Sequence, residues 1–286
     1  MLNLFISTLV SSILFTLYGQ LIVKDFKPKF FYFTETIIYG SIIISFLGLF
    51  LNFFTALKIE INTLLFVIFI TLFFRPKFFL KIKKYLLFLI FITIISYLLL
   101  FASHTYRPDA GLYHLPFIKI LNEEKIIFGL TNLHFRYGHT SIIQYLSAIN
   151  LNLITNTYGI VIPSALIAVS VILNFLSKIK NQIKLKNYNF HFYYLFGVLI
   201  YIFFKMNRYS EYGNDAPAHF LTFYLFSEFI ILNNKKVKID QILNICLLSL
   251  FIILNKLTLL PILLIPISLI IKNISFKFIK NFKIYF

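Results

Sequence analysis

Long apolar runs separated by short polar segments make up most of the chain. A helix needs about 20 residues to cross roughly 30 Å of hydrocarbon, and nine runs approach or reach that length. We place these runs at residues 2–23, 36–57, 61–74, 84–103, 158–177, 190–206, 216–232, 240–255 and 257–271. The pattern therefore predicts an all-α fold, a polytopic transmembrane helical bundle of about nine spans that forms a single domain over residues 1–286.

The polar segment 104–157 separates the fourth run from the fifth and predicts a large outer loop with interfacial helices. Its stretch Leu115 to Lys125 is amphipathic, which is typical of a helix lying in the interface plane. The apolar side holds Phe117, Ile118 and Leu121, and the polar side holds Lys119, Asn122 and Glu123.

A second stretch of this loop, Ser141 to Thr155, is apolar enough to suggest a further span. A full crossing there would invert every later loop. We therefore expect a helix that lies at, or dips into, the outer interface, and the alternative is a real crossing with a reversed C-terminal half. Ser141 and Gln144 have the S-x-x-Q spacing of a capping box, which predicts that this helix begins at Ser141.

Composition agrees with a membrane protein. The chain is 59% hydrophobic and 13% charged, and it contains 37 Phe, which is too much apolar surface for one water-soluble core. The first apolar run lacks a basic leader and a small-residue cleavage site, so we expect no cleavable secretory signal. Cys246 is the single cysteine, which excludes an internal disulfide.

The net charge of +17 lies mainly between the apolar runs. Most of the 27 basic residues form clusters at 24–29, 75–84, 178–186, 235–238 and 272–283, the last in a basic C-terminal tail over 272–286. A nine-span bundle puts all five clusters on one face, which the positive-inside rule makes cytoplasmic, with the N-terminus outside and the C-terminus cytoplasmic. Because this charge faces anionic lipid, we expect membrane lipids as partners and no nucleic acid.

Polar residues also gather on the opposite, outer face, in the 104–157 loop, in Lys205 to Asp215, and at a hairpin tip around Lys256. Asp109 and Asp215 are the acids of interest there. Simple structural explanations exist, because both acids could cap helices and Lys256 could extend from the hairpin tip into water. Polar groups held at membrane depth are nevertheless costly and are usually functional.

This inventory suits a lipid-linked substrate whose phosphate lies at the interface. Arg and Lys bind such a phosphate and stabilise the charge that develops as it leaves. A carboxylate can remove the proton from an incoming hydroxyl, or two carboxylates can share a divalent cation such as Mg²⁺ or Mn²⁺ with the phosphate. These are the parts of a sugar transferase that works on the outer face.

Four stretches carry a resemblance to a known class. "PDAGLYHLPFIKIL" from Pro108 and "GLTNLHFRYGHTSIIQYLSAI" from Gly129 look like the first outer loop of GT-C integral membrane glycosyltransferases. "NDAPAH" from Asn214 is similar to a second outer-loop acid, and "NKLTLLP" from Asn255 resembles a later helix start with Lys and Ser/Thr. The resemblance covers roughly residues 101–261, and it is to a poorly characterised bacterial branch that uses polyprenyl-phosphate sugars.

The resemblance implies roles for individual residues. Asp109 would be the catalytic base, and Asp215 the second catalytic acid, as a metal or acceptor ligand. The expected substrate-binding residues are Arg107, His114, Arg136, Arg208 and Lys256. The implied reaction is inverting transfer of a hexosyl or pentosyl group from a polyprenyl-phosphate donor to a lipid or glycan acceptor, at the outer face of a bacterial inner membrane.

Two alternatives stay open. A membrane transporter or lipid-linked glycan flippase would use Asp109 and Asp215 to couple to ions, and a degenerate GT-C relative would act as a scaffold. The chain also departs from the class, because each acid stands without an acidic neighbour and many members are longer. Its short length and basic end are typical of a truncated or unusually small member.

Overall fold

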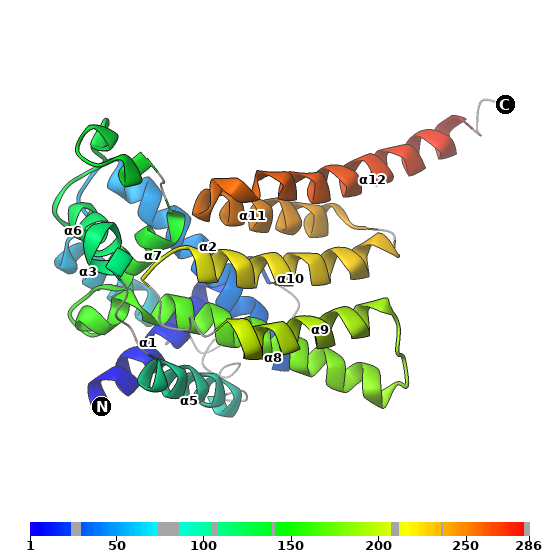
Figure 1. Ribbon diagram of the computed structural model, residues 1–286, viewed down its shortest axis with the longest axis horizontal. Coiled ribbons are helices and arrows are strands. Elements are labelled where there is room, and N and C mark those ends of the chain that lie inside the picture. Colours follow the sequence, from blue (N-terminus) through cyan, green and yellow to red (C-terminus); the bar gives the residue numbers. More distant parts are fainter. Residues whose placement is uncertain are drawn as a thin grey trace.

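The computed structural model describes residues 1–23, 30–73, 86–103, 108–138, 141–206, 212–235 and 237–282, and within these ranges it is helical without strands (Figure 1). Each of the nine predicted runs overlaps a helix. The helices are α1 (Leu2–Gly19), α2 (Phe30–Asn52), α3 (Ile59–Phe73), α5 (Leu86–Ala102), α8 (Ile162–Lys184), α9 (Phe190–Lys205), α10 (Asp215–Asn233), α11 (Ile239–Asn255) and α12 (Leu264–Phe282). The all-α prediction is confirmed.

The structure does not support nine membrane spans. Three helices are long and apolar enough to cross a membrane, at Leu2–Gly19, Phe33–Asn52 and Ile162–Lys184. Shorter apolar helical stretches of 10–17 residues lie, within the described residues, at Ile59–Ile68, Leu86–Ala102, Phe190–Lys205, Ile239–Asn255 and Leu257–Asn273, and α10 is in neither group. Helices α9 and α11, of 16 and 17 residues, rise about 24–26 Å, short of the roughly 30 Å of hydrocarbon.

Helix α8 forms the centre of the bundle, with most of its side chains buried against α2, α5 and α10. Helices α1 and α2 approach each other very closely. A Cβ atom added to Gly40 would lie 1.8 Å from the carbonyl oxygen of Phe15, and one added to Gly19 would lie 1.8 Å from that of Thr36. Small residues of this kind allow two helix backbones to meet, as in membrane helix pairs.

The helix ends fall into two groups (Figure 1). At one end, which we call the loop end, the segment 108–160 covers the ends of α2 and α11 and the start of α10. Hydrogen bonds join it there, from the Leu57 amide to the Leu121 carbonyl at 2.9 Å and from Ser7 Oγ to the Thr155 carbonyl at 3.3 Å. At the other end, the basic end, Asn273 of α12 donates to the Val237 carbonyl at 3.1 Å.

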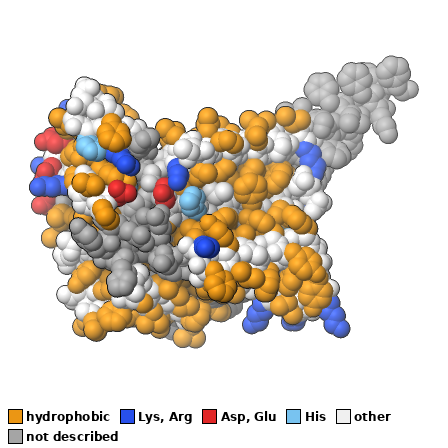
Figure 2. Space-filling model, viewed as in Figure 1, with side chains coloured by type: hydrophobic (Ala, Val, Ile, Leu, Met, Phe, Trp, Pro, Cys, Tyr) orange, Lys and Arg blue, Asp and Glu red, His pale blue; other side chains and the backbone are white. Residues whose placement is uncertain are grey.

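Charged side chains gather toward these two ends on the face drawn in Figure 2, and hydrophobic side chains cover most of the surface between them. Many of the exposed hydrophobic residues are large, and Phe204 and Leu87 are more than 80% exposed. An apolar belt between two charged ends is the surface expected of a protein that contacts lipid.

Two short helices build most of the loop end. Helix α6 (Leu115–Glu123) buries Phe117, Ile118 and Leu121, as its amphipathic pattern predicts. Asn122 does not face water as expected, because its side chain donates to the carbonyls of Leu57 at 2.6 Å and Ala148 at 3.1 Å. The apolar side of α6 therefore packs against protein.

Helix α7 (Ile142–Asn150) is buried at every residue. With nine residues it rises only about 14 Å, so it does not cross the membrane. Ser141 occupies the N-cap position of α7, as predicted, but the side-chain bonds of a capping box are absent, because Ser141 bonds to Asn255 and Gln144 to His114. Helix α12 continues to Phe282, so the predicted basic C-terminal tail is helical over residues 272–282.

Candidate functional site at the loop end

A cleft of about 330 Å³ opens at the loop end, and we call it the polar cleft. It is lined by residues between Asp109 and Phe117, by Arg136 and Tyr137, by Gln144 of α7, by the start of α10 and by the end of α11. Its lining includes five residues predicted from the sequence, namely Asp109, His114, Arg136, Asp215 and Lys256. The other two predicted residues, Arg107 and Arg208, lie outside the described residues.

Asp215 and Lys256 form an ion pair across the cleft, with 2.8 Å between Asp215 Oδ1 and Lys256 Nζ. Asp215 is the first residue of α10, where the positive end of the helix dipole favours a carboxylate, and Asn214 occupies the N-cap position. The Asp215 side chain is 39% exposed and the Lys256 side chain is 29% exposed. Neither a pure capping role for Asp215 nor simple extension of Lys256 into water accounts for this contact.

Asn255, the last residue of α11, is hydrogen-bonded to several of the segments that form the cleft. Its side-chain oxygen accepts hydrogen bonds from the Ile143 amide at 2.9 Å and from Ser141 Oγ at 3.3 Å. Its side-chain nitrogen donates to the Phe251 carbonyl at 2.9 Å, and Asn214 donates to its backbone carbonyl. Asn255 therefore caps α7 from a different helix and fixes α7, α10 and α11 relative to one another.

His114 is a buried histidine in the cleft wall. It ends a π-helical turn, Ala110–His114, and such turns are frequent at functional sites. Gln144 lies 2.7 Å from its Nδ1 atom, measured to Nε2 of the amide. Burial lowers the pKa of His114 to about 4, with nearby Asp109 and Asp215 opposing that shift and Arg136 adding to it. The ring is therefore neutral at neutral pH.

Asp109 lies at the mouth of the cleft and makes no side-chain cap, so the capping explanation fails for it too. The Tyr113 hydroxyl hydrogen-bonds the Asp109 carboxylate. Burial, and then the charge of Asp109, raises the pKa of Tyr113. Arg136 lies over the Tyr113 ring, with its guanidinium carbon 5.1 Å from the ring centroid. The cleft thus presents one hydrogen-bonded carboxylate and one stacked guanidinium at the same wall.

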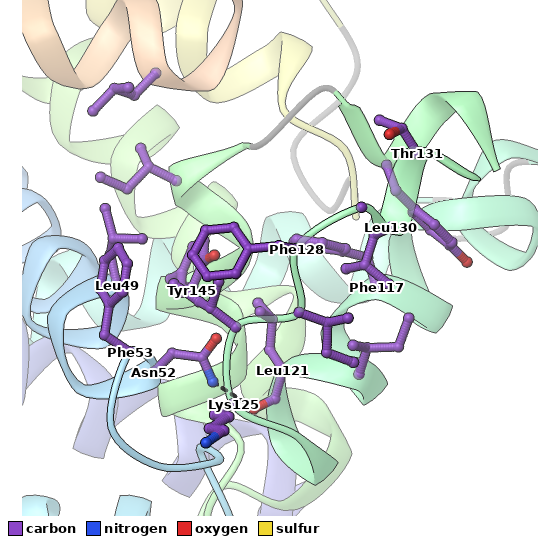
Figure 3. Close-up of a pocket in the computed structure, with 17 residues that line it drawn as sticks. Leu49, Asn52, Phe53, Phe117, Leu121, Lys125, Phe128, Leu130, Thr131 and Tyr145 are labelled. Carbon is purple, nitrogen blue, oxygen red and sulfur yellow. Dashed lines mark hydrogen bonds between the residues drawn. The ribbon is translucent and has the colours of Figure 1, made fainter. Parts of the chain in front are cut away.

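An apolar groove of about 330 Å³ adjoins the polar cleft (Figure 3). Phe117 and Tyr137 line both, and their rings lie 5.9 Å apart. The rest of the groove includes Leu49, Phe53, Leu121, Ile127, Phe128, Leu130, Ile142 and Leu254. A polar cavity and an apolar one therefore share a single aromatic wall.

Asp109 and Asp215 are also the residues that could hold a divalent cation. Mg²⁺ commonly binds one or two carboxylates together with substrate phosphates and waters, and two carboxylates open on this cleft. In the described part of the chain, no three His, Cys, Asp or Glu side chains group as a complete metal site. Asp109 and Asp215 are thus the two carboxylates of the cleft lining, and Asp215 is paired with Lys256.

Sequence reasoning missed several cleft residues. Ser141 and Gln144 were interpreted as a capping pair, although their i,i+3 spacing also puts two polar side chains on one helix face. Tyr113 and Tyr137 carried no signal of their own among 18 tyrosines. Asn255 entered the sequence analysis only as the first residue of the "NKLTLLP" stretch, without a role of its own.

A protein-family model described as "Domain of unknown function (DUF8201)" matches residues 1–286. No curated protein and no solved structure matches the chain.

Proposed function

This chain belongs to the DUF8201 family, and we propose that it is a membrane-embedded glycosyltransferase whose active site is the polar cleft. One observation carries the proposal. Asp109, His114, Arg136, Asp215 and Lys256 come from segments far apart in the sequence, and they line one cleft next to an apolar groove. A cleft with two carboxylates and two cations beside an apolar groove suits a substrate with a phosphate and a hydrocarbon chain.

The proposed setting is a bacterial inner membrane, crossed by about nine helices with the loop end outside and the C-terminus in the cytoplasm. The apolar belt between two charged ends supports membrane insertion (Figure 2). Helices too short for a 30 Å core would require local thinning of the bilayer or extension of flanking Lys side chains to the interface.

The proposed donor is a sugar linked to polyprenyl phosphate. Lys256 and Arg136 would bind the phosphate, because both cations line the cleft. The hydrocarbon chain would enter the apolar groove past Phe117 and Tyr137. The neutral His114 ring would bind a sugar hydroxyl by hydrogen bonding, since it carries no charge to offer a phosphate.

In the proposed reaction, Asp109 accepts the proton of an acceptor hydroxyl as the hydroxyl oxygen forms a bond to the anomeric carbon. The bond between that carbon and the phosphate oxygen breaks, and its electron pair leaves with polyprenyl phosphate. Lys256 and Arg136 stabilise the negative charge on the leaving phosphate. Attack from the side opposite the phosphate inverts the anomeric centre, and the acceptor is a lipid or a glycan.

A Mg²⁺ or Mn²⁺ ion would be held by Asp109 and Asp215 together with the donor phosphate. Such an ion supplies Lewis-acid stabilisation of the leaving group when it is bound. Asp215 also holds Lys256 at 2.8 Å, so it orients a phosphate-binding cation whether or not an ion is present.

The test replaces Asp109 with Asn and measures sugar transfer from a polyprenyl-phosphate donor in membranes. Loss of a general base costs about 10²–10⁴-fold in rate, and we expect a fall in that range. Glu123→Gln is the matched control, because Glu123 is an exposed acid of the loop end that pairs with Lys119 and lies outside the cleft. Equal transfer by Asp109→Asn and the control would reject Asp109 as the base.

A transporter or lipid-linked glycan flippase is the second candidate. The observation that favours it is an ion pair between Lys178 and Glu228 inside the helical bundle, where charge is expensive. A transporter would move a lipid-linked sugar or an ion across vesicles without forming a covalent product. Flux that is altered in Asp109→Asn vesicles, while no glycosylated product forms with the native protein, would favour this candidate.

A further inference from the structure

Two buried histidines of this protein make the same kind of hydrogen bond. In each, the Nε2 atom of a glutamine amide lies against Nδ1 of the ring, at 2.7 Å between Gln144 and His114 and at 2.8 Å between Gln182 and His191. Both histidines are only 6% exposed. An amide nitrogen can donate a hydrogen bond but cannot accept one. Nδ1 is therefore the acceptor in both rings.

This contact determines which ring nitrogen carries the proton. A neutral imidazole has one N–H donor and one nitrogen that accepts. Because Nδ1 accepts from glutamine, the proton lies on Nε2, which becomes a hydrogen-bond donor. Each of the two rings therefore has a second N–H group that needs an acceptor.

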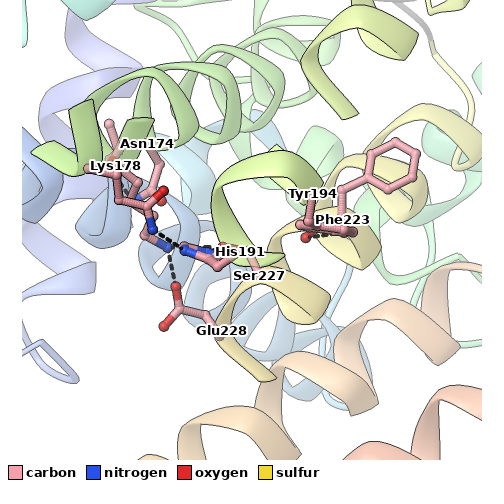
Figure 4. Close-up of polar contacts among 9 residues, drawn as sticks. Asn174, Lys178, His191, Tyr194, Phe223, Ser227 and Glu228 are labelled. Atoms are coloured by element: carbon pink, nitrogen blue, oxygen red, sulfur yellow. Dashed lines mark hydrogen bonds and ion pairs between the residues drawn. The ribbon is translucent and has the colours of Figure 1, made fainter. Parts of the chain in front are cut away.

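Inside the bundle, the protein supplies that acceptor. His191 Nε2 of α9 lies 2.9 Å from Ser227 Oγ of α10 (Figure 4). Gln182, on the other side of the ring, belongs to α8. Side chains of the chain itself thus satisfy both nitrogens of His191, and the ring links three helices without needing a ligand.

At the polar cleft, the described residues supply no such acceptor. The bond to Gln144 is the only hydrogen bond that the His114 ring makes with this part of the chain. Nε2 is not one of the fully buried polar atoms that lack a partner, so solvent reaches it from the cleft that His114 lines. An N–H donor that opens on a cleft in this way is suited to bind an oxygen atom of a ligand.

Gln144 and His114 are both held by packed helical segments. Gln144 is 3% exposed and lies in the first turn of α7, where Asn255 accepts from the Ile143 amide at 2.9 Å. His114 ends the π-helical turn that leads directly into α6. Rigid placement of this kind is what a preorganised binding group requires.

We propose that Gln144 is a positioning residue that holds His114 as its Nε2–H tautomer, so that the ring donates a hydrogen bond to a ligand oxygen in the polar cleft. That oxygen takes the place that Ser227 Oγ occupies at His191. Its assignment to a sugar hydroxyl rests on the proposed function, whereas the tautomer does not.

The experiment is ¹⁵N NMR of the purified full-length protein, labelled at histidine, in lipid nanodiscs at neutral pH. Protonated and unprotonated imidazole nitrogens give well-separated signals, and the signals that His114→Gln removes belong to His114. We expect Nε2 of His114 to be protonated and Nδ1 to be unprotonated. A protonated Nδ1 in the native protein would overturn the proposal.

Gln144→Glu provides the sharper arm. A carboxylate only accepts hydrogen bonds, so it should draw a proton to Nδ1 of His114 and move that signal into the protonated range. Gln182→Glu is the matched control, because it makes the same change at His191 and should leave the His114 signals where they are. Gln144→Met removes the amide donor without adding charge and should give a mixture of tautomers. Unchanged His114 signals in both Gln144 variants would contradict the positioning role.

Sugar transfer tests the ligand contact separately. His114→Met removes the N–H donor and should lower kcat/KM for the polyprenyl-phosphate donor about 3–10-fold, the effect of one hydrogen bond. His191→Met is the control and should leave transfer unchanged. Undiminished transfer by His114→Met would reject the ligand contact. A native protein without any transfer would instead count against the proposed function, and the NMR signals would still decide the tautomer.

Discussion

The two Lys–carboxylate pairs of this protein differ in how much water reaches them. Lys256 and Asp215 meet at the edge of the polar cleft with 29% and 39% of their side chains exposed, whereas Lys178 and Glu228 meet inside the bundle with 12% and 21% exposed. An exposed pair is worth little to stability and can exchange its partner for a ligand phosphate. A buried pair cannot be opened cheaply, so it constrains the charge of its neighbours.

Lys178→Met should have the largest effect on the free energy of unfolding. It leaves Glu228 without its cation in the bundle interior, and breaking a buried pair typically costs about 3–5 kcal/mol. Denaturant unfolding in detergent measures the loss. The double variant Lys178→Met with Glu228→Gln should recover most of the lost free energy of unfolding. A double variant as unstable as Lys178→Met alone would show that packing, not charge, explains the loss.

Asn255→Ala should come next. It removes the side chain that accepts from the Ile143 amide and from Ser141, and it leaves both donors buried. An unsatisfied buried donor costs about 1–3 kcal/mol, so we expect a loss of about 2–3 kcal/mol, measured by the same unfolding method. Ser268→Ala, a half-buried local hydrogen bond in α12, is the control and should cost much less.

His114 predicts a pH dependence of stability. Its pKa is lowered to about 4 in the folded protein, below the usual value of about 6.5, so the unfolded chain binds the proton more tightly. The contribution of the neutral His114 ring to the free energy of unfolding should be fully present above pH about 6.5. It should fall toward pH about 4, by about 2 kcal/mol once solvent screening is allowed for.

Thermal unfolding of the native protein and of His114→Gln across this pH window measures the effect. The variant cannot take up the proton, so its melting temperature should fall less on acidification. Identical pH profiles would mean that other groups, not His114, control acid stability.

Lys256→Met should have the smallest effect on stability, at most about 1 kcal/mol, because the pair it breaks is partly exposed. If the proposed function holds, its effect on sugar transfer should be much greater than its effect on unfolding, since it removes the cation proposed to bind the donor phosphate. The same Lys→Met change should therefore cost much less stability at the polar cleft than inside the bundle. A Lys256→Met variant as unstable as Lys178→Met would contradict this difference between the two pairs.

The sequence was informative wherever hydrophobic pattern alone decides structure. All nine apolar runs contain helix because an apolar segment in this setting must satisfy its backbone internally. The three buried residues of α6 followed from its helical period. Nine full spans did not follow, because among the described residues three helices are both long and apolar enough to cross a membrane.

The candidate site was predictable in part. Polar residues that interrupt an apolar sequence were visible, and five of them line one cleft. The roles of Ser141 and Gln144 were not visible, because a local capping box and a pair of tertiary contacts have the same spacing. Lys178 was assigned to a basic anchoring cluster, yet it is buried beside Glu228. Acids inside apolar helices, such as Glu228, were the signal that could have revealed it.

The sequence by itself determined that this protein is helical, apolar at its surface and charged at its helix ends, because periodicity and composition are local properties. Only the tertiary structure decided which charges meet. Asp215 and Lys256 are 41 residues apart, and Lys178 and Glu228 are 50 apart, so helix packing sets their contacts. Packing also sets their exposure, which is greater for the Asp215–Lys256 pair at the polar cleft than for the Lys178–Glu228 pair inside the bundle.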